Sequence, residues 1–174
     1  MVMEYLQVHS FDDFRAQQIF QSYCETFPED ERRSEKQFQS LFSNPNVKVF
    51  SVLKDLKNIG YLIVWELSNS VFVEHFEIFS EYRSLKYGSE IIADLFRDYS
   101  HIILEAEPET LNDDAQRRIE FYKRNGFRII DEQYIQPSYG EGKSPLNLWL
   151  LANWQPEKLE WIKEEIYDIV YRKL

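Results

Sequence analysis

The stretch VFVEHFEIFSEYRSLKYGSEIIADLF, residues 71–96, decides the fold of the chain. It begins with β-branched and aromatic residues at 71–79, a composition typical of a strand. A polar turn follows at 80–89. Apolar residues at helical spacing then predict an amphipathic helix, with Ile91, Ile92, Leu95 and Phe96 on one face.

The turn between this strand and this helix has the features of an anion site. The first turn of a helix leaves backbone N–H groups unpaired, and the helix dipole places positive potential there. Arg83 and Lys86 add full positive charges, and Gly88 would let a ligand approach the backbone. An ordinary strand-to-helix corner, with a glycine that serves packing, explains the same residues equally well.

Composition limits the classes of protein to which the chain can belong. Its 174 residues predict a single domain, 1–174, and the net charge of −10 argues against a nucleic-acid partner, which needs a basic face. An acidic surface would better suit a cationic acceptor. The single cysteine, Cys24, excludes an internal disulfide and fits a reducing compartment. No apolar run reaches membrane-spanning length and no signal peptide begins the chain, so we expect a cytoplasmic protein without a membrane partner.

Working outward from 71–96, the chain alternates between predicted helices and strands. Before it we expect strands at 3–9, 47–53 and 60–67 and helices at 10–27, capped by Ser10, and 30–42. After it we expect strands at 101–106, 127–135 and 146–151, a polar loop at 108–114 followed by a helix to about 125, and a loop at 136–143. The strand at 101–106 is nearly all apolar, which indicates a central position, parallel to 71–79 through the helical crossover.

The tail, 156–174, predicts one more amphipathic helix. Its apolar residues share a face: Leu159, Ile162, Ile166, Ile169 and Val170. We expect it to pack on its own domain as an addition to a core that ends near residue 152. A contact in a homodimer is the alternative.

Two blocks resemble the GCN5-related N-acetyltransferases (GNAT). The family's signature is Arg/Gln-x-x-Gly-x-Gly/Ala, and here Arg83 and Gly88 match it while Lys86 holds the first glycine position. The second block, RIEFYKRNGF at 118–127, is similar to the family's Tyr-x-x-x-Gly-Phe segment. The resemblance covers roughly 47–151. It implies an α/β fold with a mixed, mostly antiparallel sheet of six to seven strands, a splayed parallel pair in its middle, and flanking helices.

The same resemblance implies that acetyl-CoA is the acetyl donor. Its pyrophosphate would bind the backbone N–H groups of the turn, which are those of Ser84, Leu85, Lys86, Tyr87, Gly88 and Ser89. The pantetheine arm would lie along the backbone of Phe76, Glu77 and Ile78, with the N–H of Glu77 or Ile78 facing the thioester oxygen. Lys123 and Arg124 could meet the 3′-phosphate, or they could be solvated surface charges. Ala115 replaces an asparagine that the family often has, which predicts one cofactor hydrogen bond fewer.

Tyr122 matches the family's tyrosine, four residues before Gly126, and is the candidate acid. A phenol, with a pKa near ~10, can donate a proton to a forming thiolate, whose thiol has a pKa near ~8.5. The alternative is a core aromatic residue.

The sequence identifies the base that removes a proton from the amine less clearly than it identifies the acid. Glu74 should share a face with Phe72 and Phe76, and apolar surroundings should raise its pKa toward neutrality. Glu77 could shape the acceptor site, and Glu105 and Tyr139 are candidates for contact with the acceptor. Solvent-facing carboxylates with a water relay remain an alternative.

Two functions follow from these residues. The first is an acyl-CoA-dependent N-acetyltransferase, in which a small-molecule or peptide primary amine attacks acetyl-CoA directly in a ternary complex. The second is a non-catalytic domain of the same fold that binds CoA or a protein partner. No metal site is predicted in either case.

Overall fold

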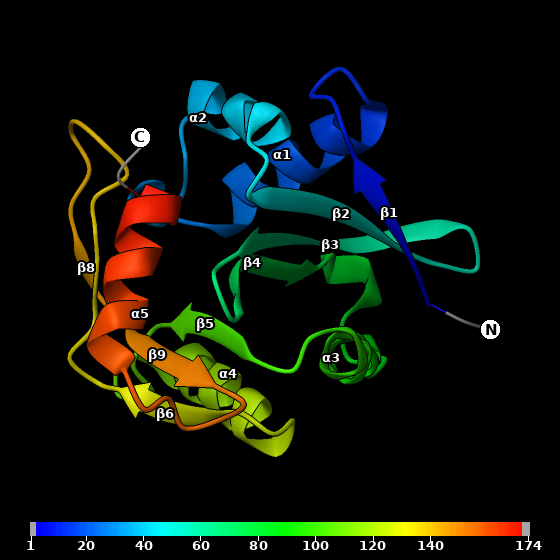
Figure 1. The fold of residues 1–174 in the computed structure, drawn as a ribbon. Coiled ribbons are helices and arrows are strands. Elements are labelled where there is room, and N and C mark those ends of the chain that lie inside the picture. The colour runs from blue at the N-terminus through cyan, green and yellow to red at the C-terminus, as the bar shows by residue number, and fades with distance from the viewer. Residues whose placement is uncertain (1–2, 172–174) are drawn as a thin grey trace.

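The computed structural model of the chain describes residues 3–171. A seven-stranded sheet runs through the molecule in the order β1-β2-β3-β4-β5-β9-β6, with helices on both of its faces (Figure 1). All neighbouring strands are antiparallel except β4 and β5. The predicted mixed α/β sheet with a parallel pair in its middle is confirmed.

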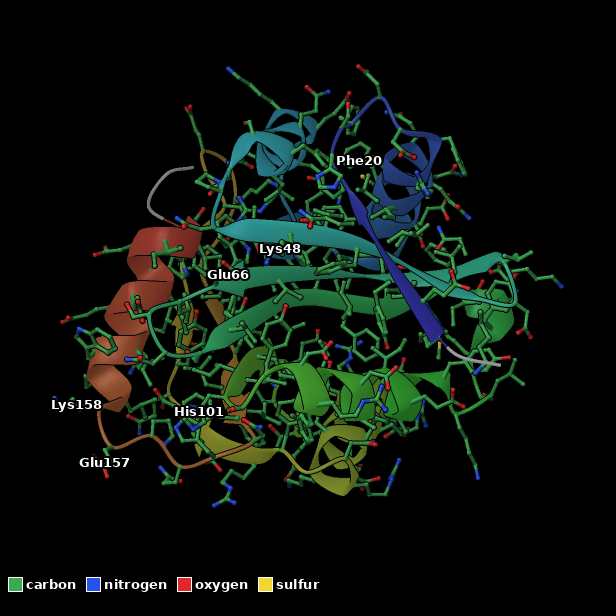
Figure 2. All side chains as sticks on the ribbon, turned by 45° about the vertical axis from the view of Figure 1, so that its right-hand side comes forward. Phe20, Lys48, Glu66, His101, Glu157 and Lys158 are labelled. Atoms are coloured by element: carbon green, nitrogen blue, oxygen red, sulfur yellow. The ribbon has the colours of Figure 1, made fainter. Side chains whose placement is uncertain are left out.

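The first half of the sheet is an antiparallel meander. It consists of β1 (Met3–Val8), β2 (Val47–Lys54), β3 (Lys57–Glu66) and β4 (Val71–Ile78). Asp55 and Leu56, both with positive φ, close the tight hairpin between β2 and β3. Lys48 and Glu66 form an ion pair between the same two strands, and Figure 2 labels both.

The parallel pair separates after three residues. β4 meets β5 (Ile102–Ala106) only at Val71–Ile102, Phe72–Ile103 and Val73–Leu104. The strand β4 nevertheless continues beside β3 as far as Ile78. Its second half therefore has one free edge, as the predicted splay requires.

One extra residue in β4 changes which of its side chains share a face. His75 pairs with Ile63 and Val73 pairs with Val64, so Glu74 forms a β-bulge. After the bulge Phe76 packs in the core beneath α3 and α4, whereas Glu74 reaches Trp65 on the opposite face. The expectation that Glu74 shares a face with Phe76 is therefore wrong, because strict alternation stops at the bulge.

The N-terminal helices start later than the sequence suggests. The helix α1 (Phe14–Thr26) is capped by Asp13, which accepts from the N–H of Arg15, and Ser10 lies in the preceding turn. The expected helix at 30–42 is broken into three pieces: η1 (Glu29–Glu31), α2 (Glu35–Ser40) and η2 (Leu41–Ser43). The break comes from Ser34, which forms a capping box with Gln37 and so starts α2 anew.

The helices α1 and α2 pack together over one face of the sheet. Phe20 of α1, labelled in Figure 2, lies against Phe38 of α2 with ring centroids 5.0 Å apart. On the other face lie α3 (Tyr87–Asp98) and α4 (Asp113–Arg124), and each face has its own apolar core. Among residues 3–171, every helix is too short or too polar to span a bilayer.

Both predicted strands after α4 are interrupted. β6 (Arg128–Asp131) ends where the carboxylate of Asp131 accepts from the N–H of Gln133 and bends the chain. The chain then forms a separate hairpin of β7 (Ile135–Gln136) and β8 (Leu146–Asn147) before β9 (Trp149–Ala152) rejoins the main sheet.

The tail forms α5 (Leu159–Ile166), which continues as a short π-helix, η4 (Tyr167–Tyr171). It stands across one end of the sheet (Figure 1). Ile162, Ile166 and Val170 are buried in the same core as α1, so the tail packs on its own domain. The last residues of the predicted helix, 172–174, lie outside the described residues, and the homodimer contact stays a prediction.

Candidate functional site

A cavity of about 750 Å³ opens where β4 and β5 separate. Its walls come from the second half of β4, the turn at 82–89, α4, the end of β5 and the segment around η1. Among the predicted site residues, those that line it are Glu74, Phe76, Glu77, Ile78, Arg83, Ser84, Lys86, Tyr87, Gly88, Ser89, Glu105, Tyr122 and Arg124. Leu85, Lys123 and Tyr139 do not reach it.

The turn before α3 presents a row of free donors. The backbone N–H groups of residues 84–88 donate to no other residue within 3–171. Ser84 and Lys86 both have a φ of 65°, and Lys86, which directly precedes α3, has a left-handed backbone conformation. Lys86 therefore adopts the conformation that a glycine at this position of the motif would favour, at a cost of about 1 kcal/mol for a non-glycine residue.

Gly88 has the packing role that the sequence analysis gave as the alternative to ligand approach. A Cβ atom on Gly88 would lie 3.0 Å from Cζ of Phe121 and 3.7 Å from Cζ of Phe76. The glycine thus lets α4 approach α3 closely, next to the cavity that Phe121 and Phe76 also line.

The free edge of β4 offers backbone donors and acceptors to the same cavity. The N–H of Phe79 donates to Ile59 of β3 at 3.0 Å, and hydrogen bonding alternates along antiparallel strands. The N–H of Glu77 therefore lies on the β3 side, whereas those of Phe76 and Ile78 lie on the side from which β5 has separated. Of the two predicted oxyanion donors, the geometry favours Ile78 over Glu77.

The side chain of Glu77 ties β4 to α1 and to the turn. Its Oε1 accepts from Ser22 at 3.0 Å, from Thr26 at 2.5 Å and from Arg83 at 3.3 Å. Arg83 also donates from Nε to the carbonyl of Ile78 at 2.9 Å. These contacts hold Arg83 against the end of β4, beside the free N–H groups.

Arginines of α4 add charge that the sequence analysis missed. Arg117 and Arg118 line the cavity along with Arg124, whereas Lys123 turns away to an ion pair with Glu109 at 3.0 Å. Arg118 precedes Tyr122 by one helical turn, so the spacing from Tyr122 could have identified it.

Tyr122 is buried, and its ring packs edge-on against Phe127 with centroids 5.6 Å apart. Its hydroxyl makes no hydrogen bond with any described residue, although Tyr122 lines the cavity. Burial raises the pKa of Tyr122 to about 12, so the phenol is protonated at neutral pH.

Glu74 is a buried carboxylate held by three hydrogen-bond donors, and its environment does not suit a general base. It accepts from Arg33 at 2.8 Å, from Trp65 at 2.6 Å and from the hydroxyl of Tyr139 at 2.8 Å. Although burial opposes ionisation, these partners, above all the Arg33 guanidinium, hold the pKa of Glu74 below its usual value. The expected rise in its pKa is wrong, because the apolar surroundings contain a buried arginine.

Tyr139 lies behind this ion pair, so the structure does not bring it to the acceptor side. Its ring covers the guanidinium of Arg33 at 5.3 Å. The neighbouring Gln136, which was not predicted, lines the cavity instead. His75 also lines the cavity, and burial lowers its pKa to about 4, so its imidazole is neutral at pH 7.

Glu105 has the raised pKa that was expected of Glu74. Burial raises the pKa of Glu105 to about 8, although a hydrogen bond from Tyr171 acts to lower it. Its Oε1 accepts from the hydroxyl of Tyr171, at the end of the C-terminal turn. The added tail therefore contributes to the site through Glu105. Among residues 3–171, no group of three or more His, Cys, Asp or Glu side chains could hold a metal ion.

Comparison with known proteins now bears on this geometry. The sequence profile of the acetyltransferase (GNAT) family matches residues 16–127. A structure assigned to the same family, from Bacteroides thetaiotaomicron, superposes with a TM-score of 0.87 at 25% identity and covers 98% of both chains. No curated protein sequence gives a significant match.

Two plant structures share the fold at lower identity. Arabidopsis thaliana NAA60 in complex with acetyl-CoA has a TM-score of 0.63 at 12% identity, over 87% of this chain and 97% of that one. Arabidopsis thaliana Naa50 in complex with the bisubstrate analogue CoA-Ac-MVNAL has a TM-score of 0.57 at 19% identity, and the match covers 87% of this chain and 98% of that one.

Proposed function

The chain belongs to the acetyltransferase (GNAT) family, and from this premise we propose that it transfers the acetyl group of acetyl-CoA to a primary amine. One observation carries the proposal. A single cavity joins a turn of free N–H groups, the free edge of β4 and the unbonded hydroxyl of Tyr122. Its similarity to structures bound to acetyl-CoA or to a CoA bisubstrate analogue supports the choice of donor.

The residues of the cavity fit acetyl-CoA. The N–H groups of residues 84–88 and the side chains of Arg117 and Arg124 suit its phosphates. The free N–H and carbonyl of Phe76, on the open edge of β4, suit the amides of its pantetheine arm, which can pair like an added strand. Bound there, acetyl-CoA supplies an acetyl group activated as a thioester.

The chain then has to supply a hydrogen-bond donor and an acid. The N–H of Ile78 can donate to the acyl oxygen, where negative charge grows as the amine nitrogen bonds to the acyl carbon. When the carbon–sulfur bond breaks, Tyr122 can donate its proton to the departing sulfur. Its raised pKa keeps the phenol protonated, so the hydroxyl can stabilise the departing sulfur by donating a hydrogen bond to it.

We propose Glu105 rather than Glu74 as the group that takes the proton of the amine. A carboxyl with a pKa of about 8 is half ionised at about pH 8, and its ionised form takes up a proton far more readily than an ordinary carboxylate, as a general base for an ammonium should. Glu74 is held ionised by Arg33 and is therefore a poor proton acceptor at neutral pH. Transfer to Glu105 can be direct or can pass through one water molecule.

Thiol release from acetyl-CoA across a panel of amines tests this function. We expect release that depends on both the protein and an amine, and a melting temperature that rises with acetyl-CoA concentration. A rise without release with any amine would favour the alternative, a non-catalytic domain that binds CoA. No rise at all would contradict the assignment of the cavity.

A further inference from the structure

The cavity is lined by charges of both signs. The cations Lys86, Arg117 and Arg124 come from the turn before α3 and from α4. Carboxylates from elements far apart in the sequence also line it, Glu31 of η1 and Glu105 and Glu107 at the end of β5. We call these three residues the acidic end of the cavity.

Glu31 and Glu107 both line the cavity, and the negative charge of Glu107 acts on Glu31. Burial, together with Glu107, raises the pKa of Glu31 to about 7. Glu107 has a cation of its own, Arg118 at 2.8 Å, whereas no ion pair of Glu31 is found within residues 3–171. Two carboxyls whose charges oppose each other's ionisation are a ready site for a cation, which would relieve their repulsion.

Glu105 adds a second carboxyl that has no cation as a partner. Its Oε1 accepts from the phenol of Tyr171, and its Oε2 accepts no hydrogen bond from a described residue. The other carboxylates of the wall are neutralised, Glu74 by Arg33 and Glu77 by Arg83. Within residues 3–171, the acidic end thus has two carboxyls in excess of its cations, Glu31 and Glu105.

The loop between β7 and β8 is fastened to the segment that carries Glu31. Ser144 donates its N–H to Asp30 at 3.0 Å, and Gln136 donates to the carbonyl of Asp30 at 3.3 Å. Gln37 donates to the carbonyl of Tyr139 at 2.6 Å, and Lys143 donates to that of Arg32. These contacts tie the loop to the segment from η1 to α2, which favours a small acceptor over a polypeptide laid across the site.

We infer that the acceptor is an aliphatic diamine or polyamine without a carboxylate group. One of its amines lies beside Glu105 and receives the acetyl group, and a second ammonium lies between Glu31 and Glu107. This inference rests on the proposed acetyltransferase function and specifies its substrate class. A carboxylate in place of the second ammonium would be repelled by the acidic end.

A series of acceptors of equal length tests the inference on the unmodified protein. 1,4-Diaminobutane, n-butylamine and 4-aminobutanoate differ only in the group at the far end of the chain. We expect kcat/KM for the diamine to exceed that for butylamine about 10- to 100-fold, as a charged hydrogen bond predicts, and 4-aminobutanoate to be the poorest acceptor. Spermidine tests the longer polyamines, and a short peptide with a free N-terminus tests the polypeptide alternative.

The variant Glu31→Gln keeps the shape of the side chain and removes its charge. We expect it to reduce the preference for diaminobutane over butylamine toward unity, mostly through KM for the diamine. Glu35→Gln, an equal change of charge on the exposed start of α2, should leave the preference as it is.

The outcomes separate the two proposals. Thiol release with butylamine or the peptide at least as fast as with the diamines would overturn the inference and leave the acetyltransferase function standing. A preference for diamines that survives Glu31→Gln would overturn the assignment of the second ammonium to Glu31. Release with none of the amines would contradict the acetyltransferase function itself.

Discussion

The substitution Glu74→Gln separates a structural from a catalytic role for the buried carboxylate of β4. The side chains of Arg33 and Glu74 are 2% and 0% exposed, and their ion pair is 2.8 Å long. Glutamine would leave the guanidinium of Arg33 buried without a counter-charge. Breaking one partner of a buried pair typically costs ~3–5 kcal/mol, a large part of the ~5–15 kcal/mol by which a domain is stable.

Urea unfolding at neutral pH measures this loss. The matched control is Glu66→Gln, which removes an ion pair with Lys48 whose side chains are 45% and 35% exposed, and should cost less than about 1 kcal/mol. In a double-mutant cycle, Arg33→Met combined with Glu74→Gln should cost less than the two single changes added together, because the buried charge is then gone.

A different result would refute this reasoning. If Glu74→Gln unfolds at the same urea concentration as the unmodified protein but loses turnover most strongly at mildly acidic pH, Glu74 acts as the base. The role proposed for Glu105 would then be wrong.

Three further predictions concern the cavity. Tyr122→Phe should lower kcat ~10²–10⁴-fold with little change in melting temperature, because its hydroxyl has no hydrogen-bond partner among the described residues; unchanged turnover would make Tyr122 structural. The pKa of Glu105 is about 8 in the folded protein against 4.5 for an ordinary glutamate, so the folded state binds the proton more tightly than the unfolded state. The stability that this proton contributes is fully present below pH 4.5 and is lost as the pH rises through about 8. Urea unfolding at several pH values should show Glu105→Gln abolishing this loss, and an identical pH profile in the variant would contradict the raised pKa. Lys86→Gly should raise the melting temperature slightly and retain acetyl-CoA binding, since glycine adopts a φ of 65° without strain; a clear fall would mean that the side chain of Lys86 matters more than its backbone.

The sequence allowed the fold to be predicted where neighbouring residues decide the structure. The strand, turn and helix of 71–96 lie where the pattern placed them, and so does the parallel crossover to β5. The basic turn was recognisable because the helix start, Arg83 and Gly88 are adjacent in the chain. The splayed pair and the C-terminal helix on its own domain followed from the resemblance and from periodicity.

What could not be predicted depends on contacts between distant residues. Arg33 lies 41 residues before Glu74, and no local pattern shows that the two meet in the core. The bulge at Glu74 shifts the alternation of β4 by one residue, and a strand pattern does not mark it. The acidic end was missed for the same reason, because Glu31 and Glu107 lie far apart in the sequence, before and after the stretch 71–96.

Amide hydrogen exchange with and without acetyl-CoA tests the central claim most directly, because the claim concerns particular backbone N–H groups. The account predicts that acetyl-CoA slows exchange at residues 84–88 and at Phe76 and Ile78, while β1, at the far edge of the sheet, is unchanged. Binding of acetyl-CoA that leaves exchange at residues 84–88 unaltered, or that protects another part of the chain instead, would contradict it.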